Sequence, residues 1–458
     1  MRFVRGLAGV AAVMLSVGVV AWAQEVKPYT PNTPSNTPPP PPNPEPTPTP
    51  TPAPAAPENE NPEAPAAPGA ETAPPTEGAL MQGLDKVGVG NRMESWGLNV
   101  YGYVEGGYLY DLTNAHDLSP AKTAPADDIF FAGPYKNTFD LDQANLTIER
   151  LIDPTKGNWD FGFHIEGLYG RDAYFTHSDG ILDNNNKEGG LHGPFDQPDL
   201  LQAYLDVNIP VGTGLDLRVG KFTDLLGLEQ INPTENIFYT HSYAFTYGMP
   251  FTETGVLGIY KFTNDETHEN VTLTAGTTRG WNQSSLDNNG DPDGVFRIDY
   301  NVGSITLDGG IIVGPEGNLP YGPPDNSHWW FVPDVAITWK ASDDLTIAAN
   351  FLYGNAQNPI QWLSAAIYAQ YQIDPMFAVT GRAEVYFDKN GITTGIGGGD
   401  VDYSEVTVGL PITPFPNTNI LNALTIRPEV RADFANVHVL DLTHDSELTG
   451  AVDFVMKF

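Results

Sequence analysis

Carboxylates and arginines recur at alternate positions in stretches that are otherwise apolar, and they are the residues best suited to do chemistry in this chain. Between Leu424 and Phe434, for example, Arg427, Glu429 and Arg431 alternate with apolar residues. Residues repeated with a period of two point to the same side of an extended strand. Facing water, such charges would set a field that favours ions of one sign. In a narrow interior, these carboxylates and arginines would instead pair with one another and stabilise its walls.

The polar positions of these stretches carry more carboxylates than arginines. Leaving aside charges at strand ends, thirteen carboxylates share this parity: Glu105, Glu149, Glu166, Asp206, Asp216, Asp299, Asp308, Asp334, Glu384, Glu405, Glu429, Asp433 and Asp453. Five arginines share it as well: Arg218, Arg297, Arg382, Arg427 and Arg431. A water-filled interior with this balance is expected to prefer cations only modestly, because salt screens hydrated charges over about 10 Å at 0.1 M.

Two further carboxylates, Glu229 and Glu235, lie in an unusual segment at 224–252. The segment is rich in apolar and aromatic residues, among them Phe238 and Tyr243, and it contains no Lys or Arg. An apolar patch of this kind would be a liability if it were exposed to water. We therefore expect the segment to fold into the interior and to form a constriction, with both glutamates facing the passage. A lid or a contact between subunits is the alternative.

Signatures of catalysis and of metal binding are missing from the sequence. It has no His-Glu-x-x-His and no Gly-x-Ser-x-Gly motif, and its cysteine count of 0 removes thiolate chemistry. Residues 287–294 are rich in Asp and Asn but lack the sixth-position glycine and the closing glutamate of a calcium loop, which favours a surface turn. We expect neither an enzyme nor a cofactor or metal. A net charge of −35 also argues against a nucleic-acid partner, because little in the chain could neutralise phosphates.

Alternation of apolar and polar residues continues along the chain after Trp96, and it predicts strands. No apolar run after the N-terminal segment approaches the roughly 20 residues of a membrane helix. Sixteen strands are predicted at 96–112, 137–150, 159–171, 199–209, 215–223, 253–262, 270–279, 293–302, 304–313, 330–340, 345–353, 361–372, 376–387, 401–410, 422–433 and 446–458. Most have about 9 to 14 residues, which is the length that crosses a bilayer at a tilt.

The links between these strands differ in length on the two edges of the predicted sheet. Those at 113–136, 172–198 and 224–252 are long, whereas those at 210–214 and 303 are short. Short turns on one edge and long loops on the other are typical of outer-membrane barrels, and closure leaves no unpaired strand edge. The expected fold is an all-β transmembrane antiparallel up-and-down barrel of about sixteen strands, and barrels of this size generally enclose an aqueous channel.

Two segments are expected to precede a barrel domain at 81–458. A basic start, an apolar core and the small residues at positions 21 and 23 predict a cleaved signal peptide at 1–23. Residues 24–80 form a disordered Pro-rich linker, because 20 of the 41 prolines lie between Pro28 and Pro75. Such a stretch favours extended polyproline II. It is either a solvated spacer or a strut that contacts the cell wall.

The last predicted strand ends on Phe458, which follows Val452, Phe454 and Met456 on one face. An aromatic residue at the end of an alternating strand is typical of the assembly signal of bacterial outer-membrane barrels. The outer-membrane assembly machinery is therefore an expected partner.

Four stretches carry motifs of a known family. They are 101–108, 139–143, 170–173 and, the longest, 202–252, which includes Gly220-Lys221-Phe222. These stretches resemble the putative beta-barrel porin-2 family of bacterial outer-membrane proteins, and the resemblance covers most of the chain after residue 95. Glu253 stands where the family pattern has a histidine, so no role is carried over to that position. The resemblance implies a barrel in the outer membrane that acts as a passive channel, and it does not imply a particular solute.

Together these observations predict an outer-membrane porin, a diffusion channel for small hydrophilic solutes with weak cation selectivity. Its constriction is expected at Glu229 and Glu235. Its pore-lining charges are expected at Arg218, Arg297, Arg382, Arg427, Arg431, Glu105, Glu166, Asp299, Glu384 and Glu429. Outer-membrane lipid would surround the barrel, and general sixteen-stranded porins suggest a homotrimer by analogy. The alternative is a structural protein that tethers the outer membrane to the cell wall through its Pro-rich segment.

Overall fold

A computed structural model describes nine stretches of the chain. They are residues 78–113, 137–182, 196–264, 269–316, 329–356, 360–396, 398–418, 423–440 and 444–458. The signal peptide expected at 1–23 and nearly all of the linker expected at 24–80 lie outside the described residues, so both stay predictions.

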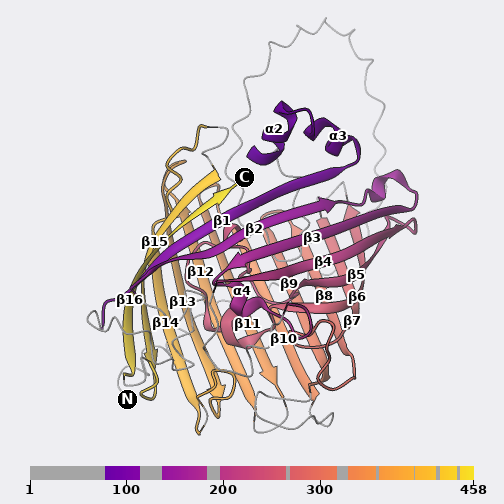
Figure 1. Cartoon of the computed structure of the whole chain (residues 1–458). Coiled ribbons are helices and arrows are strands. Elements are labelled where there is room, and N and C mark those ends of the chain that lie inside the picture. Colours follow the sequence, from indigo (N-terminus) through magenta and orange to yellow (C-terminus); the bar gives the residue numbers. More distant parts are fainter. Residues whose placement is uncertain are drawn as a thin grey trace, which may run out of the picture. The chain divides into compact units, whose positions relative to one another are not determined.

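Sixteen strands form one closed antiparallel barrel (Figure 1). Their bounds are β1 Leu98–Asp111, β2 Phe139–Arg150, β3 Asp160–Gly170, β4 Gln197–Ile209, β5 Leu215–Thr223, β6 Thr252–Asn264, β7 Glu269–Thr278, β8 Asp293–Val302, β9 Ile305–Pro315, β10 Trp329–Lys340, β11 Leu345–Asn355, β12 Gln361–Gln372, β13 Ala378–Lys389, β14 Val401–Gly409, β15 Leu424–Ala435 and β16 Ser446–Lys457. Each strand pairs with its neighbours in the chain, and β1 pairs with β16 from Tyr103↔Lys457 to Asp111↔Thr449, which closes the barrel. The predicted fold class is confirmed, and every predicted strand lies within two residues of an observed one at both ends.

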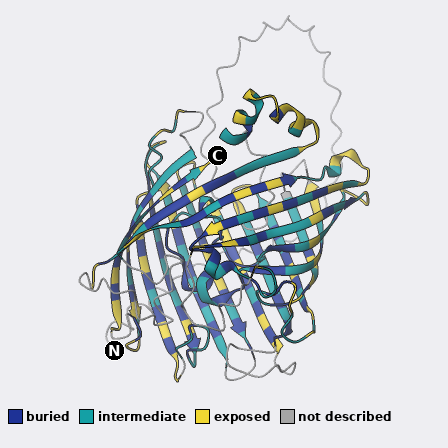
Figure 2. Ribbon diagram, viewed as in Figure 1, coloured by how far each residue is buried: buried dark blue, intermediate teal, exposed yellow. Residues whose placement is uncertain are grey.

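Burial alternates along the strands in the opposite sense to that of a water-soluble protein. On β15, the apolar side chain of Val430 is 51% exposed, whereas that of the next residue, Arg431, is 1% exposed. All thirteen carboxylates predicted to face the interior are between 0% and 8% exposed. Figure 2 shows exposed and buried residues following one another along many strands. An apolar exterior around a polar interior is the arrangement of a barrel that sits in lipid.

The two edges of the barrel carry connections of different length, as predicted. Gly303 and Ser304 alone join β8 to β9, and Gly303 has a φ of +57°, which favours glycine. On the other edge, residues 224–251 join β5 to β6. In outer-membrane barrels, the edge with the long loops lies on the extracellular side of the membrane.

A few short helices accompany the strands, and none of them was predicted. The helices α2 (Ala79–Lys86) and α3 (Gly90–Ser95) precede β1 and contact it. The 3-10 turn η2 (Pro154–Lys156) joins β2 to β3, and α4 (Ala173–Thr176) follows β3. None of the helices in the described part of the chain combines the length and apolar character needed to cross a membrane.

Candidate functional site: the loop inside the barrel

The segment at 224–251 folds into the barrel and packs against its inner wall. Leu226, Phe238, Tyr243 and Phe245 are all buried, and Tyr243 stacks on Tyr403 of β14 with ring centroids 4.8 Å apart. Two short turns shape the segment, the 3-10 turn η4 (Pro233–Glu235) and the π-helical turn η5 (Ala244–Gly248). We call residues 224–251 the inner loop. Its apolar residues explain its position, because the interior removes them from water.

Carboxylates of the barrel wall accept hydrogen bonds from backbone N–H groups of the inner loop. Glu429 of β15 accepts hydrogen bonds from the N–H groups of Tyr239 and Thr240, at 2.8 and 3.1 Å. Glu384 of β13 accepts them from Tyr243 and the residue after it, at 2.6 and 2.8 Å. These carboxylates therefore satisfy backbone donors that a loop outside regular secondary structure would otherwise leave unpaired.

Wall arginines hold the carbonyl groups of the same loop. Arg427 donates to the carbonyl oxygens of Pro233 and Asn236, at 2.8 and 2.7 Å, and Arg382 donates to that of Thr240 at 2.6 Å. Two further wall arginines do the same: Arg297 donates to Leu225, and Arg431 to His241. Four of the five predicted arginines thus hold the inner loop in place.

Glu229, one of the two predicted constriction residues, is deeply embedded in this network. Its carboxylate lies 2.9 Å from the guanidinium of Arg382 and accepts hydrogen bonds from the Tyr368 hydroxyl at 3.0 Å and the Ser242 N–H at 2.8 Å. The Nδ1 atom of His241 lies 3.0 Å away. Burial alone would raise the pKa of Glu229, but Arg382 and His241 outweigh it and hold that pKa at about 2. Glu229 is therefore ionised, and its charge is compensated.

Glu235, the other predicted constriction residue, has a different environment. It is only partly buried, and its carboxylate accepts a hydrogen bond from the Asn232 side chain at 3.1 Å. Burial, helped by the negative charge of Glu166, outweighs the attraction of Lys457 and raises the pKa of Glu235 to about 7. Glu235 therefore changes its charge near neutral pH.

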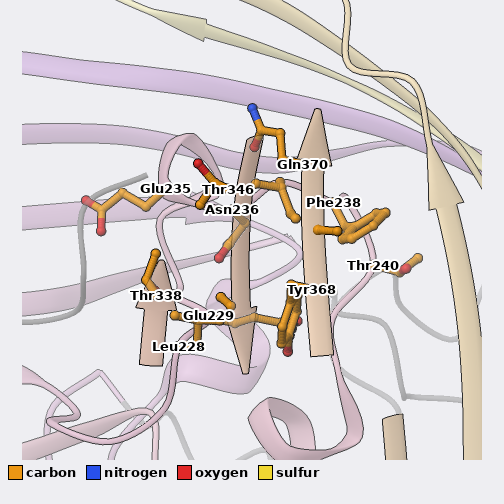
Figure 3. Close-up of a pocket in the computed structure, with 13 residues that line it drawn as sticks. Leu228, Glu229, Glu235, Asn236, Phe238, Thr240, Thr338, Thr346, Tyr368 and Gln370 are labelled. Carbon is orange, nitrogen blue, oxygen red and sulfur yellow. Dashed lines mark hydrogen bonds between the residues drawn. The ribbon is translucent and has the colours of Figure 1, made fainter. Parts of the chain in front are cut away.

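Both glutamates line one cavity of about 60 Å³ between the inner loop and strands β10, β11 and β12. Its lining residues are Leu228, Glu229, Glu235, Asn236, Ile237, Phe238, Thr240, Thr338, Thr346, Ala348, Tyr368, Ala369 and Gln370. Figure 3 shows Glu229 beside Tyr368, whereas the carboxylate of Glu235 lies apart from them. No Lys or Arg is among the lining residues, which leaves both carboxylates but no basic group in contact with the cavity.

The other predicted pore-lining charges occur mostly as pairs. Arg218 lies 2.9 Å from Asp206. Three predicted carboxylates have basic partners: Glu105 with Arg427, Asp299 with Arg297, and Glu166 with His164. The geometry brings these charges together in the interior, and their effect on permeating ions stays a prediction.

Sequence reasoning missed a second set of residues that fastens the inner loop. The Gln143 side chain donates to Asp172 at 2.7 Å and to the carbonyl oxygen of Ile231 at 2.8 Å. The Tyr239 hydroxyl donates to Asp142 at 3.1 Å. The available signal was the family motifs at 139–143 and 170–173, which contain these carboxylates and this amide.

The fold and its interior define the class of this protein: an outer-membrane β-barrel whose interior is narrowed by an inserted loop. The sequence model of the family described as "Putative beta-barrel porin-2, OmpL-like" matches residues 97–458. The chain belongs to that family, which confirms the resemblance seen in the sequence. As a member, it is a porin of the bacterial outer membrane and is surrounded by outer-membrane lipid.

Solved structures with a similar fold include other outer-membrane proteins. A loop-deletion mutant of OmpT, an outer membrane protein of Vibrio cholerae, is 10% identical over 79% of this chain and 99% of that chain, with a TM-score of 0.46. The anion-selective porin from Comamonas acidovorans is 10% identical over 79% and 99%, with a TM-score of 0.49. A comparison with curated protein sequences found no match.

Proposed function

We propose that this porin forms a water-filled diffusion channel for small hydrophilic solutes and that it weakly prefers cations. The observation that carries the proposal is the cavity beside the inner loop, because its lining contains Glu229 and Glu235 but no Lys or Arg. A cation approaching this lining meets negative charge, and an anion meets no basic side chain that touches the cavity. Passive diffusion needs no catalytic group, so we propose a channel and not an enzyme.

The preference is weak because one of the two carboxylates that line the cavity is compensated. Arg382 neutralises Glu229 at 2.9 Å, and the arginines of the wall pair with carboxylates or with carbonyl groups of the inner loop. Of the two carboxylates that line the cavity, Glu235 is the one that no basic group of the described residues contacts. One charge in a wet passage has a small effect on ions, because water and salt screen it.

The size and lining of the cavity support small hydrophilic solutes. Its volume of about 60 Å³ corresponds to a few water molecules. Asn236, Thr338, Thr346 and Gln370 contribute polar groups to the lining.

Recordings from the purified protein in planar bilayers test this function. Discrete conducting steps are expected, and a KCl gradient should give a reversal potential of the sign that cation preference requires. Glu235→Gln should move that potential toward zero. Asp153→Asn is the matched control, because it removes one exposed charge in the turn after β2, and it should change nothing. An anion-selective channel would contradict the charge argument.

The same recordings separate the channel from the structural alternative. Folded protein that inserts but shows no conducting steps would favour a tether between the outer membrane and the cell wall through residues 24–80. That alternative falls on residues outside the described part of the chain. A homotrimer and recognition by the assembly machinery also stay predictions, and crosslinking of the native membrane tests the first of them.

A further inference from the structure

Two connections on the long-loop edge meet at a buried carboxylate. Residues 279–292 join β7 to β8, and Glu316 directly follows β9. One carboxylate oxygen of Glu316 accepts a hydrogen bond from the Trp281 N–H at 2.6 Å, and the other lies 3.3 Å from the Gln283 amide nitrogen and 3.4 Å from that of Asn288. Glu316 therefore organises a loop that belongs to a different connection.

A second buried carboxyl group lies directly against that of Glu316. Asp293, the first residue of β8, is 1% exposed, and its carboxyl group interacts directly with that of Glu316. Apart from the carboxyl group of Glu316, neither oxygen of Asp293 has a hydrogen-bond partner among the described residues. Two ionised carboxylates offer only acceptors to each other, so a shared proton or a cation must lie between them. Gly314 makes room for this contact, because a Cβ atom there would lie 1.7 Å from an Asp293 oxygen.

A third oxygen beside this pair is also buried and has no donor. It is Oδ1 of Asn288, whose Nδ2 lies 3.4 Å from Glu316. The two ends of an amide are exchanged by a half-turn of the side chain and are assigned from the surrounding hydrogen bonds. After that turn, the amide oxygen would face the Glu316 carboxylate.

No basic side chain compensates these oxygens in the stretches that the structure describes. No ion pair there joins Asp293 or Glu316 to a Lys, Arg or His. Buried charges of one sign in proteins are paired or coordinate metals.

We propose that Asn288, Asp293 and Glu316 bind one Ca²⁺ ion, which fastens residues 279–292 to the rim of the barrel. Carboxylate and amide oxygens are the ligands that Ca²⁺ takes, and water or carbonyl groups complete its six to eight positions. Within the described ranges, no set of three His, Cys, Asp or Glu is placed to hold a metal. The site proposed here needs only two carboxylates and one amide. Sites of this kind on extracellular modules bind Ca²⁺ with dissociation constants of about 10⁻⁴ to 10⁻³ M.

The sequence alone does not reveal this site, because its two carboxylates are far apart in the chain: Asp293 begins β8, whereas Glu316 follows β9. Residues 287–294 have the Asp and Asn content of a calcium loop but no closing glutamate. Glu316 would supply that carboxylate from beyond β9, across the pairing of β8 with β9. Asp287 is not among the proposed ligands, because its Oδ1 atom accepts hydrogen bonds from the N–H groups of Asn289 and Gly290 within the turn.

Calorimetric titration of the folded full-length protein with Ca²⁺ alone tests the proposal. The protein is first treated with a chelator and then held at 0.15 M salt, so that diffuse binding to an acidic chain is screened. We expect one site per chain and weaker binding of Mg²⁺. Tb³⁺ used as a second probe should give luminescence on excitation of tryptophan, because the backbone N–H of Trp281 donates to Glu316 and so places this residue beside the site.

The same titration, repeated with variants, identifies which residues bind the ion. Glu316→Gln and Asp293→Asn should each weaken Ca²⁺ binding at least about tenfold, because each removes a charged ligand. Asp287→Asn is the matched control: it removes one negative charge from residues 279–292, keeps an oxygen that can cap the turn, and should weaken binding far less than Glu316→Gln does. If the two buried variants fail to show the heat-modifiable migration of a folded barrel, Asn288→Ala replaces them and should also weaken binding.

Three results would overturn the proposal. The first is the absence of a saturable site in the folded wild type. The second is equal affinity in the wild type and in the folded variants at Glu316, Asp293 or Asn288. The third is a loss of binding in Asp287→Asn as large as in Glu316→Gln, because binding would then follow the charge of the loop and not this set of oxygens.

Discussion

Arg382 of β13 and Glu229 of the inner loop form an ion pair with a distance of 2.9 Å, although 153 residues separate them in the chain. The same guanidinium lies 2.6 Å from Glu405 of β14 and donates to the carbonyl oxygen of Thr240 at 2.6 Å. One buried side chain therefore connects two strands of the wall to two points of the loop. We therefore expect the position of the loop to depend on this charge being matched.

Glu229→Gln is expected to loosen the inner loop without unfolding the barrel. The amide keeps the size of the side chain but loses the charge that pairs with Arg382, while Glu405 still compensates the arginine. Weakening a buried charged hydrogen bond costs about 1–3 kcal/mol. The urea midpoint of unfolding should fall, and single-channel current should rise or become noisier. Glu235→Gln is the control and should leave the midpoint unchanged. Equal midpoints for both variants would show that the ion pair does not hold the loop.

The alternation of residues such as Val430 and Arg431 was enough to predict the strands and the inward direction of thirteen carboxylates, but not that of buried charges such as Lys221. The composition of 224–252 was enough to place that segment inside. The partner of each charge could not be predicted, because a period of two says which side a residue faces and not which carbonyl group it meets. Arg427 reaches Asn236 from 191 residues away, for example. The helices α2 and α3 were missed because they are short and lie just before the alternating pattern, which begins at Trp96.

Phe458 is expected to be important for assembly of the barrel. Its N–H donates to the carbonyl oxygen of Gly102 at 2.8 Å, and its own carbonyl oxygen accepts from the Gly102 N–H at 3.1 Å, which extends the closing pair of strands. Phe458→Asp would place a charge where the apolar face of β16 ends. The yield of heat-modifiable barrel in outer-membrane fractions should fall severalfold, whereas Phe458→Tyr should retain it. A normal yield of Phe458→Asp would contradict the assembly role.

Deletion of residues 25–75 is expected to leave the barrel intact. This stretch contains almost no large apolar residues, so it offers little surface for a core to bury. With residues 1–24 retained for export, the shortened protein should show the same heat-modifiable migration and the same conductance as the full chain. Loss of folding after this deletion would show that the stretch is part of the barrel structure. Normal conductance together with detachment of the protein from cell-wall fractions would instead support a tethering role.

Cation preference is expected to depend on pH through Glu235. Because burial raises the pKa of this carboxyl group to about 7, it is neutral in most molecules at pH 5.5 and negative in most molecules at pH 8.5. Glu229, with its pKa held at about 2, stays ionised across this range. The cation preference should therefore grow as the pH rises through 7. The increase in the ratio of cation to anion permeability should be about two- to fivefold, because a unit charge a few ångströms from an ion is worth at most about 1 kcal/mol in water.

Reversal potentials across a KCl gradient, measured at several pH values, check this dependence on Glu235. Glu235→Gln should give a low preference at every pH and should abolish the step near pH 7, whereas the control Asp153→Asn should keep the step. The step should also grow as ionic strength falls, because the Debye length increases from about 10 Å at 0.1 M to about 30 Å at 0.01 M. A step of the same size in Glu235→Gln would assign the titration to another group of the interior. If the selectivity of the wild type does not change with pH, permeating ions do not pass Glu235.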